Sequence, residues 1–223
     1  MIKKDKRMKK LFALFFCINA SLGMQNDIEK QDNLQLYRTL FHFEGSLKVN
    51  QILSCSYGFV NWASISAGHI DVGGDFVNNK DAQCHAFSIT TAKDCDKFFS
   101  PGSLTVDHKL TIANPHTPIV FSPYALNIAS LVKNGIYMGR IYSCMGENGW
   151  GTIKVLDYEN ASFWEGIPTY EFDGKLAQLE TALSEGITEA GSLAEFVDYL
   201  KIHLVPPQPK PTIVQRLTAW IGL

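Results

Sequence analysis

The chain has 223 residues, of which 46% are apolar and 19% charged, and its formal net charge is −2. The charge is unevenly distributed: residues 1–23 carry six basic side chains and one acidic one, which leaves 14 − 21 = −7 for the other 200 residues. An acidic body without clustered Lys and Arg argues against a nucleic-acid partner, and the apolar content is sufficient for one or two packed domains.

The N-terminus has the layout of a secretory signal peptide. Its lysines end at Lys10, and the apolar run at residues 11–18 is shorter than the roughly 20 residues of a membrane-spanning helix. Ser21 and Gly23 then place small side chains at the −3 and −1 positions of a cleavage site. We therefore expect residues 1–23 to be a removed leader and the protein to be periplasmic or secreted, with at most peripheral membrane contact. A lipidated cysteine and an uncleaved anchor are the alternatives.

Short strands dominate the predicted body, from about residue 34 to 158. β-Branched residues bounded by Pro or Gly indicate strands at 86–90, 104–112 and 119–121. Apolar and polar residues alternate within 104–112, which predicts that His108 lies on the buried face as a core or rim histidine. We find no internal repeat.

One buried helix is predicted at about residues 123–133. Ser122 can cap it, Pro123 suits its first turn, and Gly135 lies where a helix would end. The segment between is apolar on nearly every face, which indicates burial under a sheet. Two further strands, 136–144 and 150–158, are joined by a glycine-containing loop and predict an antiparallel hairpin.

Two helices are expected after a body that spans residues 24–172. Leucines from Leu176 onward form one apolar stripe, and Ser192 with Glu195 forms a capping box ahead of a second stripe. The predicted fold class is therefore α+β, with an antiparallel strand-rich body, one buried helix and two C-terminal helices. The helical segment 173–205 either packs on the body or forms a small subdomain.

A proline-rich linker at residues 206–211 leads into an amphipathic tail at 212–223. The predicted partner-binding face of this tail consists of Ile213, Val214, Leu217, Trp220 and Ile221. A helix of this length is marginal alone in water, so we expect the apolar face to pack on another surface. The candidate surfaces are the body of the same chain, a partner protein or second copy, and a membrane interface.

Four cysteines remain after removal of the leader: Cys55, Cys84, Cys95 and Cys144. An even number in an exported chain predicts two structural disulfides, whose pairing the sequence leaves open. A Cys84–Cys95 bond would close a short local loop. No two cysteines have C-x-x-C spacing, so we expect neither a metal site nor another cofactor.

Residues 55–60, Cys-Ser-Tyr-Gly-Phe-Val, resemble the nucleophile segment of the NlpC/P60 cell-wall peptidases, and residues 68–74 resemble their histidine strand. The resemblance implies a Cys55 thiolate nucleophile and a His69 base. The first motif has one extra residue, and only 13 residues separate Cys55 from His69, where that family places several secondary-structure elements. A Cys-His peptidase is therefore an alternative and not the leading prediction.

Strong catalytic motifs are absent from the sequence, which has no Gly-x-Ser-x-Gly, phosphate-loop or His-Glu-x-x-His segment. An acidic loop at residues 71–81 suggests calcium ligands, and carboxylates around Trp164 suggest a glycosidase, but neither has diagnostic spacing. The leading prediction is an exported, non-catalytic component or accessory of a cell-envelope assembly that acts through protein–protein contacts. A secreted hydrolase or effector is the alternative.

Overall fold

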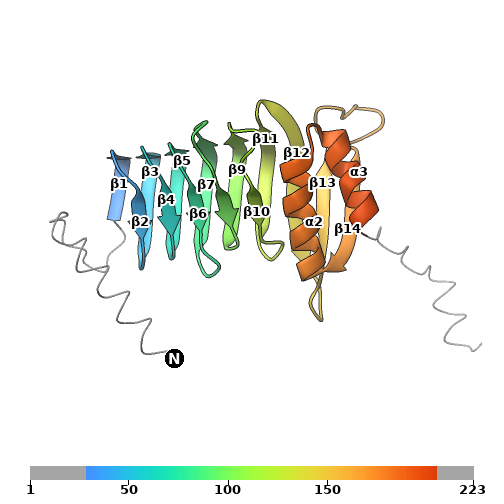
Figure 1. Cartoon of the computed structure of the whole chain (residues 1–223), viewed down its shortest axis with the longest axis horizontal. Coiled ribbons are helices and arrows are strands. Elements are labelled where there is room, and N and C mark those ends of the chain that lie inside the picture. Colours follow the sequence, from blue (N-terminus) through green and yellow to red (C-terminus); the bar gives the residue numbers. More distant parts are fainter. Residues whose placement is uncertain (1–28, 205–223) are drawn as a thin grey trace, which may run out of the picture.

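The computed structural model describes residues 29–204, which form a β-solenoid with two helices at its C-terminal end (Figure 1). The long strands are β1 (Glu29–Leu36), β3 (Ser46–Cys55), β5 (Ser64–Val72), β7 (Gln83–Thr91), β9 (Ser103–Ile112), β11 (Leu126–Lys133), β12 (Ile136–Met145), β13 (Trp150–Leu156) and β14 (Thr169–Lys175). The short strands are β2 (Leu40–His42), β4 (Phe59–Asn61), β6 (Phe76–Asn78), β8 (Phe98–Ser100) and β10 (Ile119–Phe121). The helices are α2 (Leu176–Glu189) and α3 (Leu193–His203).

The strands form two sheets that share one core. The long sheet has the order β1-β3-β5-β7-β9-β11-β12-β13-β14, and the short sheet has the order β10-β8-β6-β4-β2. Pairing is parallel from β1 to β11 and throughout the short sheet, and it becomes antiparallel only from β12 onward. The predicted antiparallel α+β body is therefore wrong, although the predicted β12–β13 hairpin is confirmed.

The solenoid is an internal repeat that the sequence analysis missed. Residues in register on the first six long strands are Glu29, Leu47, Ile65, Cys84, Leu104 and Leu126. By subtraction the coils are 18, 18, 19, 20 and 22 residues long. Because the coil length varies from 18 to 22 residues, core side chains do not recur at one constant period, and the repeat is weak in the sequence.

The predicted buried helix at 123–133 is wrong, because this segment forms the central strand β11. The Ser122 hydroxyl accepts a hydrogen bond from the Tyr124 amide, which is a turn and not a helix cap. Asn134 and Gly135, both with positive φ, then make a two-residue hairpin turn into β12. A short apolar run fits a buried helix or a central strand equally well, and pairing with strands on both sides decides for the strand here.

A stack of phenylalanines fills the core behind the short strands. The ring centroids of Phe59 and Phe76 are 4.7 Å apart and those of Phe76 and Phe98 are 4.5 Å apart, with interplanar angles of 4° and 6°. Phe121 ends the stack edge-on, 5.6 Å from Phe98. All four side chains are fully buried, so the short strands β4, β6, β8 and β10 each contribute one ring to a continuous column.

A second column, of buried polar side chains, lies two residues further along the short strands. Asn61 Nδ2 donates to Asn78 Oδ1 at 3.0 Å, and Asn78 Nδ2 donates to Ser100 Oγ at 3.2 Å. Asn61 also accepts from the Ala63 amide and donates to the Gln83 carbonyl, each at 3.0 Å. The ladder thus provides hydrogen-bond partners for backbone groups in the turns, where no neighbouring strand can pair with them.

His42 occupies the equivalent position on β2, one coil before Asn61, and makes stability depend on pH. It pairs in register with Asn61, its Nε2 donates to the Ser64 carbonyl at 3.2 Å, and burial lowers its pKa below 6.5. Because the unfolded state then binds a proton more readily than the folded state, stability falls as pH decreases through and below 6.5. We expect the midpoint of unfolding to decrease as the pH is lowered from 7.5 to 5.5. We expect a smaller decrease for His42→Asn, which places at this position the residue type found at position 61 on the next coil. An equal decline in both proteins would contradict the assignment.

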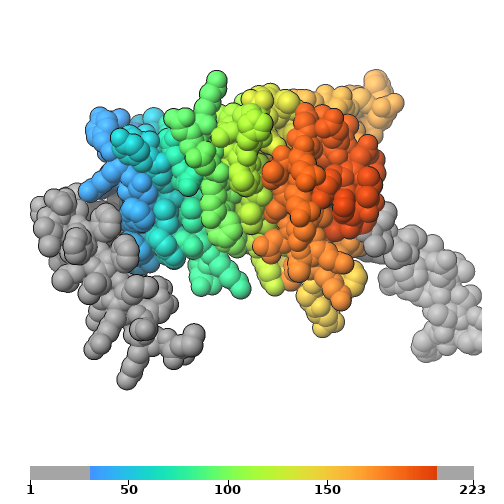
Figure 2. All heavy atoms as spheres, viewed as in Figure 1, coloured from blue at the N-terminus to red at the C-terminus, as the bar shows by residue number. Residues whose placement is uncertain are grey.

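Helix α2 lies beside the short strand β10, and α2 and α3 together cover the inner face of β12–β14 at the C-terminal end of the solenoid (Figure 2). The short edge strand β10 donates its Ile119 and Phe121 amides to the Thr188 and Ser184 hydroxyls of α2. Lys133, buried at the end of β11, donates from Nζ to the carbonyls of Ile187 and Thr188 in the last turn of α2. The cation thereby meets the negative end of the helix dipole and holds α2 against the sheet.

Several predictions concern residues outside the range that the structure describes. These are the leader at 1–23, the linker at 206–211 and the tail at 212–223 with its apolar face. Within residues 29–204, no helix has the length and apolar character needed to cross a membrane.

Candidate functional site

Cys55 and His69 lie on neighbouring strands but on opposite faces of the long sheet. The Cys55 side chain is in the core with 1% exposure, whereas His69 is exposed. The register places His69 opposite Ile52 and Cys55 opposite Val72. Burial raises the pKa of the Cys55 thiol to about 12. The structure therefore does not bring a thiolate and an imidazole base together. The two residues that resemble those of a peptidase do not form a catalytic site.

The four cysteines of the described chain are free thiols. Burial raises the pKa of Cys55 and Cys84 to about 12 and also raises that of Cys95, while Cys144 is exposed. Cys84 is near the start of β7 and Cys95 lies beyond its end, so at about 3.3 Å per residue the strand alone separates them by far more than the ~7 Å limit for a disulfide. The predicted disulfides find no support, and the buried thiols serve as small core side chains.

The carboxylates near Trp164 do not converge on a site. Glu171 forms an ion pair with Lys154, and Asp173 accepts from the Thr152 hydroxyl at 2.5 Å. Trp164 itself is 90% exposed. Across residues 29–204, no group of three or more His, Cys, Asp or Glu side chains is arranged to hold a metal ion.

His108 is exposed and not buried, because β9 has an extra residue at this point. Between Val106 and Lys109, both Asp107 and His108 lie opposite the single residue Phe87 of β7. Such a bulge interrupts the alternation of faces, and the side chains at 107–109 are all exposed. The alternating pattern in the sequence is therefore misleading at His108.

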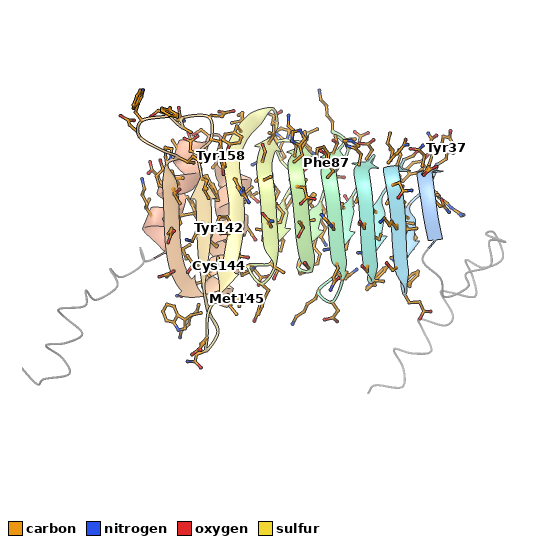
Figure 3. The ribbon with its side chains drawn as sticks, turned by 180° about the vertical axis from the view of Figure 1, so that it is seen from behind. Tyr37, Phe87, Tyr142, Cys144, Met145 and Tyr158 are labelled. Atoms are coloured by element: carbon orange, nitrogen blue, oxygen red, sulfur yellow. The ribbon has the colours of Figure 1, made fainter. Side chains whose placement is uncertain are left out.

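Three side chains, His69, Phe87 and His108, form what we call the ring row across β5, β7 and β9. The His69 and Phe87 ring centroids are 5.8 Å apart at 83°, and those of Phe87 and His108 are 5.0 Å apart at 20°. Phe87 is still 50% exposed. Figure 3 shows it on the outer face of the long sheet, on the opposite side from α2 and α3.

Apolar and charged groups flank the ring row. Ile52, in register with His69 on β3, is 42% exposed and extends the apolar surface toward the N-terminal coil. Two residues before Phe87 on β7, His85 Nε2 lies 2.7 Å from Asp107 Oδ2 of β9. An apolar strip bordered by a hydrogen-bonded polar pair has the composition of a protein contact with a polar rim.

Aromatic and cationic side chains occupy the same outer face over β12 to β14. Tyr142 has the Arg140 guanidinium 5.8 Å and the Lys154 ammonium 6.0 Å from its ring centroid. Glu171 pairs with Lys154 on the next strand. Figure 3 shows Tyr142 and Cys144 along β12 on this face. The outer face therefore has two aromatic centres, one with histidines and one with cations.

The geometry of the ring row favours contact with a protein surface. Stacking turns one face of the Phe87 ring and one face of the His108 ring toward each other, which covers these two faces. A sugar or a nucleobase binds to a free aromatic face, whereas a protein surface packs equally well against ring edges. The residues of the ring row were not recognised together because their spacings, 18 and 21 residues, reflect coil lengths that the sequence analysis had not found.

Comparisons with known protein families, with curated proteins and with solved structures found no match to this chain.

Proposed function

We propose that the protein is an exported, non-catalytic component of a cell-envelope assembly, and that it binds a partner protein through the outer face of its long sheet. The observation that carries the proposal is the ring row, in which a half-exposed Phe87 lies between two histidines on a sheet face that no helix of residues 29–204 covers. Exposed aromatic side chains grouped with a polar rim are typical of protein contact sites.

Export is supported by the leader and is compatible with the cysteine chemistry. The thiolate is the form of cysteine that reacts with oxidants and disulfides. Cys55 and Cys84, with pKa values raised to about 12 by burial, form almost no thiolate at neutral pH. These free thiols can therefore persist in an oxidising compartment without disulfide formation.

The tail provides a proposed second contact. Its apolar residues lie outside the described range, and the argument for them is the helical spacing of Ile213, Leu217 and Trp220 in the sequence. The acidic body, at −7 after removal of the leader, argues against nucleic acid as the partner.

Phe87→Glu is expected to abolish partner binding without unfolding the protein. The substitution puts a negative charge at the centre of the ring row, and the half-exposed position places that charge in solvent instead of the core. Affinity recovery from cross-linked envelope fractions should yield at least tenfold less of the specific partner than the wild type does. Removal of residues 206–223 in a separate variant tests the tail.

The matched control is Phe163→Glu, because Phe163 is 92% exposed on the loop that joins β13 to β14, outside the ring row. We expect its partner recovery to equal that of the wild type. Equal recovery by Phe87→Glu and Phe163→Glu would contradict the proposed surface, and turnover of a cell-wall substrate by the purified protein would contradict the non-catalytic assignment.

A further inference from the structure

Two cationic residues flank the strand β11 on the outer face of the long sheet. In this sheet β11 lies between β9 and β12. The register places residues 107–109 of β9 on one side of Ala129 and Ser130, and Arg140 of β12 on the other side. At a strand spacing of about 4.8 Å, the backbones of β9 and β12 are roughly 10 Å apart, which the long side chains of Lys109 and Arg140 can together span. The short side chains on β11 form the floor between them.

The two cations have no acidic partner in the described chain. Within residues 29–204, Lys109 and Arg140 belong to none of the ion pairs. The carboxylate of Asp107, two residues before Lys109, pairs instead with His85 of β7, on the side of β9 that is away from β11. Both positive charges next to β11 are therefore available to an anionic ligand.

Arg140 is partly desolvated without a compensating anion. Its Nε atom is buried and has no hydrogen-bond partner in residues 29–204, and its guanidinium carbon lies 5.8 Å from the centroid of the Tyr142 ring. No acceptor in this range binds its two terminal nitrogens, and neither of them is fully buried. Partial burial strengthens the attraction of a cation for an anion, and a guanidinium binds a carboxylate through two parallel hydrogen bonds.

We propose that Lys109, Ser130 and Arg140 form a carboxylate site that binds an Asp or Glu side chain of the partner protein. The proposal rests on the ring row as the partner-binding surface. Figure 3 shows Phe87 and Tyr142 on the same face, and two strand spacings, about 10 Å, separate β7 from β11. One partner segment can therefore place an apolar side chain on Phe87 and a carboxylate over β11.

A protein carboxylate fits this site better than a phosphate group does. Phosphate sites usually add backbone amides from a glycine-rich loop or a helix N-terminus, and at this point the residues belong to the strands β9, β11 and β12. The body, at −7 after removal of the leader, repels a polyphosphate or an anionic lipid surface. The neighbouring ring row requires a ligand with apolar as well as acidic groups, which a protein segment provides.

Photo-crosslinking with benzoylphenylalanine at position 87 tests the site in cells. Arg140→Gln is expected to lower the yield of the partner adduct about tenfold, because it removes the partly desolvated cation. Lys109→Gln should lower the yield about twofold to threefold, because Lys109 is exposed and its ion pair is weaker. The matched control is Lys48→Gln, at an exposed lysine of β3 outside the site, which should leave the yield unchanged.

The purified protein tests the same site without the partner. Nuclear magnetic resonance resolves the Nε–H signals of arginine side chains, so the signal of Arg140 reports on anion binding. We expect a soluble peptide with Leu and Glu residues to shift this signal, and the same peptide with Gln in place of Glu to leave it unchanged. Inorganic phosphate and phosphatidylglycerol vesicles should shift it only at much higher concentrations than the Glu peptide does.

Three outcomes would overturn the carboxylate site. They are equal adduct yields from Arg140→Gln and Lys48→Gln, equal shifts of the Arg140 signal by the Glu and Gln peptides, and a shift by phosphate or vesicles at a lower concentration than by the Glu peptide. The third outcome would assign the two cations to a phosphate group. No adduct from position 87 in the otherwise wild-type protein would overturn the proposed function instead, and the peptide titration would then decide the carboxylate site alone.

Discussion

Phe76→Ala is expected to lower the free energy of unfolding by about 3–5 kcal/mol, the usual cost of removing a fully buried aromatic ring. Phe76 is one of the two inner members of the core stack, with rings at 4.7 Å and 4.5 Å on its two sides, so its loss leaves a cavity between two coils. Because each coil is stabilised mainly by its neighbours, the cavity weakens both coil interfaces at once. Urea unfolding followed by circular dichroism measures the change.

Two substitutions serve as controls for this prediction. Phe76→Leu refills most of the volume and should cost much less than the alanine substitution. Phe163→Ala, at a position that is 92% exposed, should change stability by less than about 0.5 kcal/mol. A loss below about 1 kcal/mol for Phe76→Ala would show that the stack is not in the core.

Asn61→Ala is expected to cost about 2–4 kcal/mol, because it leaves several buried polar groups without partners. The Asn61 side chain serves the Ala63 amide, the Gln83 carbonyl and Asn78 Oδ1, all within 3.0 Å. With Asn61 at 0% exposure, water cannot replace these bonds without opening the turn. Chemical denaturation again measures the loss.

Asn50→Ala is the matched control, since Asn50 also makes a side-chain hydrogen bond between adjacent coils, at 2.9 Å to Asp32. That bond is exposed, and water replaces it after the substitution, so we expect a change below about 1 kcal/mol. Similar losses for Asn50→Ala and Asn61→Ala would contradict the role of the buried ladder.

The columns that stabilise the coils were visible in the sequence, but only as fragments. Phe59-Val60-Asn61 and Phe76-Val77-Asn78 are identical tripeptides, 17 residues apart, that place one ring and one amide in the core of successive coils. Neighbouring coils replace the amide with His42 or Ser100, and this variation hides the repeat. Hydrogen bonding along the ladder tolerates such exchanges because each side chain keeps a donor or an acceptor.

Turn and capping residues predicted the local structure correctly where that structure depends only on residues close together in the sequence. The hairpin between β12 and β13 and the Ser192 cap of α3 follow from turn and capping residues, and both are present. Asn134-Gly135 is an equally strong hairpin signal, but it was interpreted as the end of a helix. The choice between helix and strand for β11 depended on its pairing with β9, whose residues in register lie about one coil earlier, and with β12.

The candidate site was not predictable residue by residue. His69, Phe87 and His108 meet only because three coils stack in register and because a bulge turns His108 outward. Nothing in the local sequence marks that bulge. The two residues of the peptidase resemblance, Cys55 and His69, lie on opposite faces of the long sheet. This is because successive positions of a strand alternate between core and surface.

Site-specific photo-crosslinking tests the proposed binding surface most directly. With benzoylphenylalanine at position 87, irradiation of intact cells is expected to join the protein to one specific envelope protein, and the same probe at position 163 is expected to give no such product. A specific adduct from position 163 but none from position 87 would contradict the assignment of the ring row as the partner-binding site.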